Sequence, residues 1–364
     1  MTDNGSHREI SQKEARILES IKPSRIIIPI IIGLVAIGYL MWRQLDLEEF
    51  KAVEWTTWVW FWIGLSLILL IIRHLAYAAR LKSLAGGTFS WMKSIELIFI
   101  WEFSSAVSPT SLGGSVVAFF MLAQEKLSAA RTATIVVYTI IIDTIFFIVG
   151  IPLLYMMFGP EGIRPGANSF EDLAAWGWTL VILCFAMGAY GAFFYYGMFI
   201  NPKKLKSALL WVTSFRWLSG WKEKAAELGD DIIVASADIR GKSMSYHLSI
   251  MFYTAAAWSC RFLILNCLII AFVQTTPLDL FNQGMLYARS ENMFMIMAFS
   301  PTPGGSGLAE IVFGGFLSDF LPLTIAVLVA LLWRIITYYV YLIAGVLIVP
   351  NWIRKVLNRR RQAT

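Results

Sequence analysis

Long apolar segments separated by short polar ones run through most of the chain. A helix needs roughly 20 consecutive apolar residues to cross a bilayer, and six of these segments are close to that length or longer. The pattern therefore predicts an all-α integral membrane protein. The six predicted transmembrane spans are residues 25–42, 55–72, 132–158, 173–199, about 246–273, and 321–350.

Two further apolar segments are too short to cross a bilayer twice as full spans, and each is broken by proline and glycine. The first is 94–123, with SPTSLGGS at its centre, and the second surrounds SPTPGGSGLAE, which begins at Ser300. Lipid satisfies no backbone N–H or C=O, so such a break must be covered by protein or line a cavity. We therefore predict two re-entrant hairpins, whose second half-helices begin at Ser115 and Gly307.

Lysines and arginines determine the predicted orientation, because the cytoplasmic loops of membrane proteins are enriched in them. Polar segments of this chain are alternately basic and acidic or neutral. Both termini are therefore predicted in the cytoplasm, with the protein in the cell (inner) membrane and the two hairpins entering from opposite sides. The basic segments are 1–25, 73–93, 126–131, 200–243 and 354–361, and the predicted outer loops are 43–54, 159–172 and 274–282.

The polytopic domain is predicted to extend over residues 25–350, and its polar flanks have separate roles. Residues 1–24 are too mixed in charge for a signal peptide, so we expect a cytoplasmic tail followed by an anchor that is retained. The amphipathic segment 200–243 is expected on the surface of the inner leaflet. Residues 351–364 are predicted to form a basic cytoplasmic tail.

The domain contains an internal repeat. When the two proline-glycine motifs are aligned, Asp143 falls on Arg334, so ionisable residues of opposite charge occupy equivalent places within apolar spans. Each half, about 25–158 and 173–350, consists of two spans, a hairpin and one more span. The predicted orientations of the halves are opposite, which is the inverted-repeat arrangement of secondary transporters.

The two hairpins are the candidate binding sites. The N-terminus of a half-helix carries a positive dipole end and free N–H groups that suit an anionic headgroup. The alternative is that proline and glycine only allow close helix packing. The candidate substrate-binding residues are Ser108, Pro109, Gly113, Gly114, Ser115, Asp143, Ser300, Pro303, Gly304, Gly305, Ser306, Gly307, Glu310 and Arg334.

Ionisable residues within apolar spans are costly unless they pair or serve a function. Asp143 and Arg334 are interpreted either as a polar pair or gate facing a cavity, or as a salt bridge that ties the halves together. Glu310 is interpreted as a binding residue or as a helix cap. Glu102 and Arg261 are weaker candidates, for which a local ion pair or a snorkelling end is expected.

Composition narrows the function class. At 58% hydrophobic over 364 residues, the chain is too apolar for a soluble domain, and its net charge of +6 suits anionic lipid rather than nucleic acid. Cys184, Cys260 and Cys267 show neither a disulfide framework nor a metal spacing. The sequence contains no Walker loop, no HExxH sequence and no nucleophile–base pair. No cofactor, no metal and no enzymatic activity are therefore expected.

The run PTPGGSGLAE, the following span that contains Arg334, and the weaker first copy resemble the lysylphosphatidylglycerol synthase transmembrane region, also called the flippase-like domain family. The resemblance covers nearly the whole chain after residue 25, and it implies movement of lipid between leaflets. The best-known members add a soluble aminoacyl-transferase domain. This chain ends shortly after Pro350, so aminoacyl transfer is not expected. The first copy departs from the family pattern at Ser115, where an acid is often found, and at Ile140, where an arginine often precedes the span aspartate.

We therefore predict a lipid flippase or transporter-like membrane protein that binds or translocates an anionic lipid or lipid-linked headgroup between leaflets. One alternative is a membrane-embedded transferase acting on a lipid carrier. Another is a non-transporting partner of a different membrane protein. Anionic membrane lipids are the expected partners, and the sequence is compatible with a homo-oligomer.

Overall fold

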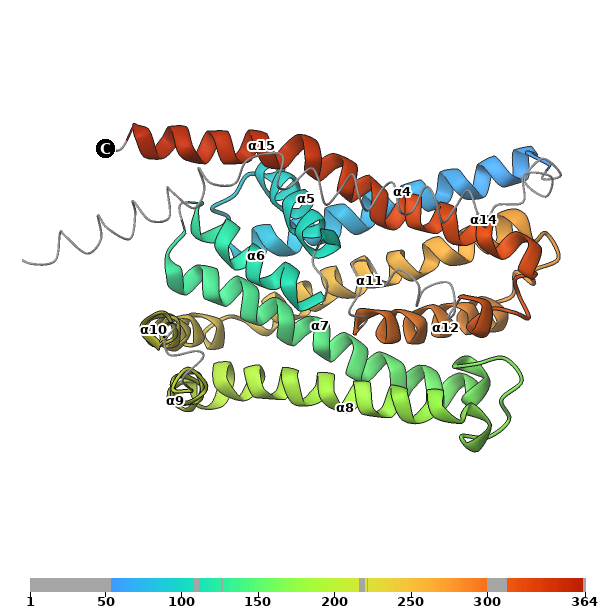
Figure 1. Ribbon diagram of the computed structural model, residues 1–364, viewed down its shortest axis with the longest axis horizontal. Coiled ribbons are helices and arrows are strands. Elements are labelled where there is room, and N and C mark those ends of the chain that lie inside the picture. The colour runs from blue at the N-terminus through green and yellow to red at the C-terminus, as the bar shows by residue number, and fades with distance from the viewer. Residues whose placement is uncertain are drawn as a thin grey trace, which may run out of the picture.

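The computed structural model describes residues 54–107, 111–125, 127–215, 220, 222–299 and 313–362, and every regular element within these ranges is helical (Figure 1). Short π-helical segments, η3 (Tyr196–Ile200) and η6 (Ile335–Tyr339), continue α8 and connect α14 to α15. The α-helices are α4 (Thr57–Leu84), α5 (Trp91–Val107), α6 (Ser111–Ala123), α7 (Ala129–Phe158), α8 (Ala175–Tyr195), α9 (Pro202–Val212), α10 (Lys222–Arg240), α11 (Met244–Phe272), α12 (Leu280–Ala298), α14 (Leu323–Arg334) and α15 (Val340–Arg361). Two 3₁₀ helices, η1 (Pro160–Gly162) and η2 (Glu171–Leu173), lie between α7 and α8.

Five helical segments in the described ranges are long and apolar enough to cross a membrane. They match five of the six predicted spans, and the remaining one, 25–42, lies outside the described residues. The prediction of an all-α membrane protein is therefore confirmed. The five segments are Thr57–Leu84, Ala129–Phe158, Ala175–Ile200, Met244–Phe272 and Ile325–Arg359.

Helix α4 is longer than the predicted span 55–72. It begins after the N-cap Thr56, whose hydroxyl accepts a hydrogen bond from the backbone of Val59, and continues to Leu84. Arg73 and Arg80 were expected in a cytoplasmic loop, but their exposed fractions are only 0% and 7%. That expectation is wrong because carboxylates on neighbouring helices pair with both arginines inside the bundle.

The C-terminal helix also extends beyond its predicted end. The span was expected to stop at Pro350, with a basic tail after it, but α15 continues through Pro350 to Arg361. A proline inside a helix removes one backbone hydrogen bond. Burial of Trp352 and Val356 in the bundle stabilises the extra turns, so tertiary packing overrides the local stop signal.

Helices α5 and α6 form the first predicted hairpin region. They are two separate helices that pack against each other (Figure 1). Residues 108–110 between them lie outside the described residues, so the re-entrant hairpin stays a prediction. The second helix begins at Ser111 rather than at Ser115, because Gly113 and Gly114 adopt helical conformations. Ser108 and Pro109 lie outside the described residues.

The long helices lie side by side, and α4 packs along α11 in antiparallel orientation. Two hydrogen bonds mark the ends of this contact: the indole of Trp58 donates to the carbonyl of Ile270 (3.0 Å), and Arg80 donates to Thr254 (2.9 Å). Helices α5 and α6 lie near one end of the bundle, and α12 lies near the other (Figure 1). Helices α9 and α10 are seen end-on in this view, so they cross the direction of the long helices.

Candidate functional site

Polar side chains are concentrated inside the apolar bundle, where four of the spanning segments and α12 meet. Several ionisable groups there are almost completely buried. In a membrane interior such groups mark either structural ion pairs or a functional site. Their partners distinguish these two cases.

The first polar group joins α4, α7 and α11. Arg80 Nη1 lies 2.5 Å from Asp143 Oδ1, and the indole of Trp258 donates a hydrogen bond to the same oxygen over 3.1 Å. Asp143 therefore pairs with a cation from α4 and not with Arg334, contrary to the predicted pair. The resemblance implied an arginine one turn before Asp143; Ile140 occupies that place, and α4 supplies the charge instead.

The second group joins α4 to α5. Arg73 Nη2 lies 2.6 Å from Glu102 Oε2, which confirms the local ion pair expected for Glu102. The guanidinium carbon of Arg73 also lies 5.1 Å from the ring centroid of Tyr77 and 5.0 Å from that of Tyr341. Charge and ring faces together compensate for the loss of water around this arginine.

Arg261 of α11 is held differently. Within the part of the chain that the structure describes, its guanidinium makes no hydrogen bond or ion pair, and its Nε atom is buried without a partner. The guanidinium carbon lies 4.5 Å from the ring centroid of Phe294 and 5.6 Å from that of Trp258. The prediction of a local ion pair or a snorkelling end is therefore wrong for this residue.

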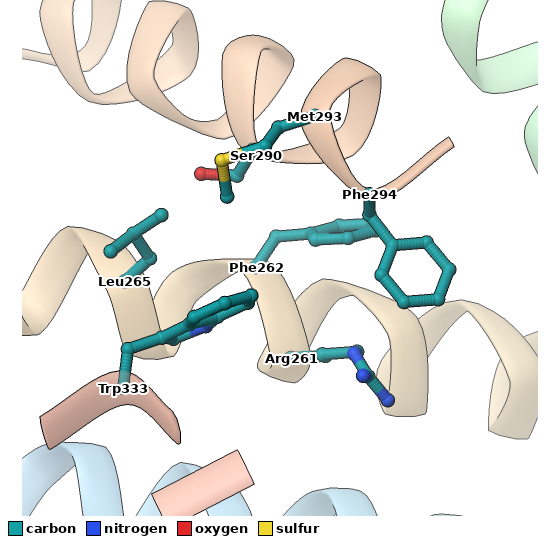
Figure 2. Close-up of a pocket in the computed structure, with 7 residues that line it drawn as sticks. All are labelled: Arg261, Phe262, Leu265, Ser290, Met293, Phe294 and Trp333. Carbon is teal, nitrogen blue, oxygen red and sulfur yellow. The ribbon is translucent and has the colours of Figure 1, made fainter. Parts of the chain in front are cut away.

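Arg261 lines a small pocket between α11, α12 and α14 (Figure 2). The lining side chains fill this pocket almost completely and leave no room for a water molecule, in contrast to the roughly 300–1,000 Å³ of typical ligand sites. A ligand group can therefore enter only if the helices move apart. Its walls are Arg261, Phe262, Leu265, Ser290, Met293, Phe294 and Trp333.

The guanidinium of Arg261 therefore has hydrogen-bond donors without acceptors among the described residues, and it lies beside apolar side chains of the pocket. Arginine presents a planar fork of N–H groups that matches phosphate and carboxylate oxygens. The aromatic faces stabilise the charge and occupy none of these donors. The pocket is thus suited to one anionic group attached to an apolar body. The central position of Arg261 in the predicted span, one turn after Trp258, was the sequence signal for this site.

The other predicted site residues are distributed as follows. Arg334 is buried at the end of α14, and its neighbour Trp333 lines the pocket. Gly113, Gly114 and Ser115 lie in the first turns of α6. The second motif, from Ser300 through Glu310, lies outside the described residues. Within the described ranges, no three His, Cys, Asp or Glu side chains come together as a metal site would require.

Comparisons with known proteins agree with the earlier resemblance. The family model described as the lysylphosphatidylglycerol synthase TM region matches residues 26–345. The chain is also similar to a UPF0104 membrane protein of Archaeoglobus fulgidus. The two are 24% identical over 300 residues, which cover 79% of this chain and 85% of the relative. No solved structure matches the chain.

Proposed function

The chain belongs to the lysylphosphatidylglycerol synthase TM region family, and we propose that it binds an anionic lipid or lipid-linked headgroup and moves it between the leaflets of the cell membrane. In this proposal the protein acts as a carrier rather than as an enzyme. Both termini face the cytoplasm.

The observation that carries the proposal is Arg261 in its apolar pocket. Carboxylates within the bundle neutralise other arginines, such as Arg73 and Arg80. The guanidinium of Arg261 lies against ring faces and makes no ion pair with a carboxylate of the described residues. A phosphate or carboxylate that enters the pocket gains a charge-assisted hydrogen bond, which is about twice as strong as a neutral one.

The architecture that we propose for transport has six spans and two oppositely inserted re-entrant hairpins related as an inverted repeat. The positions of the short helices support it: the α5–α6 pair lies near one end of the bundle, and α12 leads towards the second motif from the other (Figure 1). A headgroup at the pocket would then lie between the two hairpins, as in transporters built from such repeats.

Lipid movement in proteoliposomes tests the proposal. The purified protein is reconstituted with fluorescent phosphatidylglycerol, and dithionite quenching reports how fast the probe changes leaflets. We expect the wild type to accelerate this exchange, and Arg261→Gln to lower the rate about tenfold or more, since a hydrogen bond to a charged group contributes about 1.5–3 kcal/mol. Arg354→Gln on the exposed surface of α15 is the matched control and should retain the rate.

Three outcomes contradict the proposal in different ways. A wild-type protein that leaves the probe in its original leaflet is not a carrier of this lipid class. An Arg261→Gln variant with the wild-type rate shows that the anion is bound elsewhere. Chemical modification of the headgroup, detected by mass spectrometry of the extracted lipid, would identify a transferase instead.

A further inference from the structure

Glu291 of α12 is a buried acid without a counter-charge. Its exposed fraction is 1%, and its Oε1 atom is buried with no hydrogen-bond partner. Among the residues that the structure describes, no cation lies within ion-pair distance of this carboxyl group. The hydroxyl of Ser290 and the side-chain NH2 group of Asn292 are equally buried and donate to backbone carbonyl groups, whereas Asn292 Oδ1, like Glu291 Oε1, has no hydrogen-bond partner among the described residues.

The protonated form of Glu291 is the stable form in this position. Glu102 and Asp143 show how the bundle accommodates charged carboxylates, because an arginine contacts each of them. An unpaired carboxylate in a low-dielectric interior is strongly destabilising. A neutral carboxylic acid does not carry that penalty, so Glu291 holds a proton in this conformation.

Helix α7, which faces Glu291, leaves space for its carboxyl group but provides no positive charge beside it. Gly150 of α7 lies against the carboxyl group, and a Cβ atom added to it would lie 2.6 Å from Glu291 Oε1. Glycine inside a helix is less stabilising than alanine, and here it creates the space that the carboxyl group occupies. This part of α7 thus provides room for a neutral acid and no cation for a charged one.

The surrounding titratable groups offer no compensation either. Those that face Glu291 are Tyr287 of α12 and Cys184 of α8, both uncharged in their ordinary forms at neutral pH. The remaining charged groups on α12 and on the elements packed against it are engaged elsewhere or exposed. They are Arg289, which pairs with Asp319; Arg261, which stacks on Phe294; Asp143, which pairs with Arg80; Arg131, which pairs with Asp238; and Glu161, which is exposed.

The same helix carries one wall of the headgroup pocket. Ser290, Met293 and Phe294 line the pocket (Figure 2), whereas the carboxyl group of Glu291 lies against Gly150 of α7. Loss of the proton leaves an unpaired carboxylate beside Gly150, which favours movement of α12 away from α7. The pocket wall, including the ring that stacks on Arg261, moves with the helix.

We propose that Glu291 is a proton-binding site and that proton uptake and release there couple the transmembrane pH gradient to headgroup movement. This inference rests on the function proposed above. In each cycle the carboxylate takes one proton from the solution on one side, packs as a neutral acid against Gly150, and releases the proton to the other side. No covalent bond to the lipid is formed.

A pH gradient across the proteoliposome membrane tests the coupling, again with fluorescent phosphatidylglycerol as the probe. We expect the wild-type rate to change several-fold when the gradient is imposed or reversed. Glu291→Gln resembles the protonated acid in shape and charge, so it should fold and should give a rate that does not respond to the gradient. Glu161→Gln, on the exposed loop, is the matched control and should respond like the wild type.

Infrared spectroscopy separates this inference from the carrier function. A protonated carboxyl group has a carbonyl stretching band that a carboxylate lacks. This band should be present at neutral pH in the wild type and in Glu161→Gln, and absent in Glu291→Gln, whether or not lipid moves. Lipid exchange without any response to the gradient overturns the coupling and leaves the carrier function standing. Absence of the band from the wild type overturns the proton site itself.

Discussion

Some arginines inside the bundle contact carboxylates and others contact aromatic rings. We infer a structural role for the first kind and a ligand-binding role for the second. Arg73 and Arg80 each contact a carboxylate, so they fix α4 against α5 and α7. Arg261 contacts aromatic rings, so its hydrogen-bond donors stay available to a ligand. Replacing the first kind should reduce stability, whereas replacing the second should reduce anion binding.

The pair of Arg80 and Asp143 gives a prediction about stability. Arg80→Gln and Asp143→Asn should each lower the free energy of unfolding by about 3–5 kcal/mol, because each leaves an uncompensated buried charge. The double variant carries neither charge and should recover part of the loss, with a coupling energy of about 1–3 kcal/mol. Reversible unfolding in mixed detergent micelles measures all four proteins.

The same cycle with Arg334→Gln in place of Arg80→Gln is the control. Since Asp143 bonds to Arg80 and Trp258, the effects of Arg334→Gln and Asp143→Asn should add to within about 0.5 kcal/mol. Strong coupling of Asp143 to Arg334, with none to Arg80, would contradict the pairing described here.

The ion-pair partner of a buried residue was harder to predict from the sequence the farther away along the chain that partner lies. The local ion pair of Glu102 could be anticipated, because an acid within an apolar segment needs a nearby cation. The partner of Asp143 could not, because Arg80 precedes it by 63 residues and meets it only through helix packing. The predicted register aligned Asp143 with Arg334, but equivalence between repeats does not require contact.

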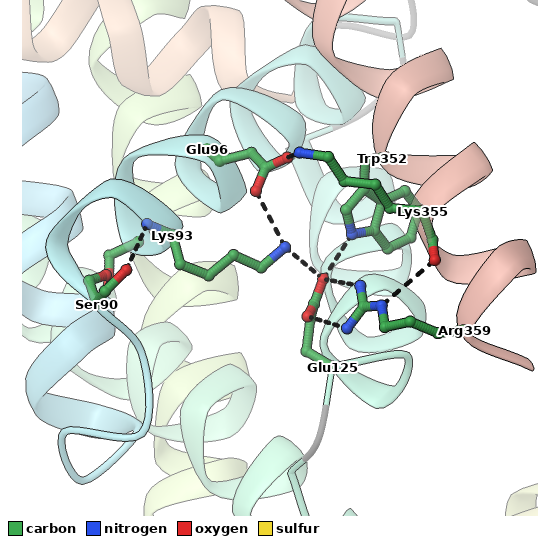
Figure 3. A network of polar contacts seen from close by, with 8 residues as sticks. Ser90, Lys93, Glu96, Glu125, Trp352, Lys355 and Arg359 are labelled. Atoms are coloured by element: carbon green, nitrogen blue, oxygen red, sulfur yellow. Dashed lines mark hydrogen bonds and ion pairs between the residues drawn. The ribbon is translucent and has the colours of Figure 1, made fainter. Parts of the chain in front are cut away.

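At the scale of elements, a polar cluster connects the α5–α6 pair to the end of α15 (Figure 3). Glu125, just after α6, accepts hydrogen bonds from the indole of Trp352 (2.7 Å) and from Arg359 (3.3 Å), and it lies 2.6 Å from Lys93 Nζ. Burial raises the pKa of Glu125, but the hydrogen bonds from Lys93, Trp352 and Arg359 outweigh this effect, and the pKa lies below its ordinary value. The carboxylate thus anchors α15 to the hairpin.

Stability should depend on pH through this carboxylate. Its pKa is depressed in the folded state, so its contribution is complete above the ordinary value of 4.5 and is lost as the pH falls through the folded value. Glu125→Gln should lower stability at neutral pH by about 1–3 kcal/mol, and the difference from the wild type should shrink in acid. Thermal unfolding at neutral and acidic pH measures both effects, with exposed Glu223→Gln as the control. A constant difference at every pH would contradict this role.

Close packing of α15 on α5 gives a second element-scale prediction. A Cβ atom at Gly345 would overlap the side chain of Phe103, whereas one at Gly64 of α4 would meet nothing within 4 Å. Gly345→Ala should therefore destabilise the protein by about 1–3 kcal/mol through overpacking. Gly64→Ala should be neutral or stabilising by up to about 1 kcal/mol, since alanine is the better helix former. Equal unfolding midpoints for the two variants would show that α5 shifts freely on α15.

Helix positions were more predictable than helix ends. The apolar segments identified the described spans because their length and hydropathy are local properties. The ends of α4 and α15 were missed because each continues past a local stop signal, Arg73 or Pro350, where tertiary contacts compensate. The start of α6 was misplaced for a similar reason, since Gly113 and Gly114 lie within the helix.

At the scale of the whole molecule, the polar connections separate by charge. One end of the bundle carries the loop between α7 and α8 and the loop before α12, with acidic residues such as Glu171, Asp172 and Asp279. The other end carries α9, α10 and the end of α15, in which lysines and arginines outnumber acidic residues (Figure 1). The positive-inside tendency therefore predicts that this second end faces the cytoplasm.

Cysteine labelling tests that orientation. The native residues Cys184, Cys260 and Cys267 are free thiols and are first replaced by alanine. Single cysteines are then introduced at Asn168 and Leu280 at the acidic end, and at Ser207 on α9 at the basic end. In intact cells, a membrane-impermeant maleimide should label the first two positions and should not label Ser207→Cys.

The three positions were chosen because each side chain is accessible at the surface, so a lack of reaction reports sidedness and not burial. After the cells are opened, Ser207→Cys should react as fully as the other two, which controls for its intrinsic reactivity. Labelling of Ser207→Cys in intact cells, with protection of Asn168→Cys and Leu280→Cys, would reverse the orientation. Outside labelling at both ends would contradict the span count instead, because α8 has to carry the chain across the membrane between Asn168 and Ser207.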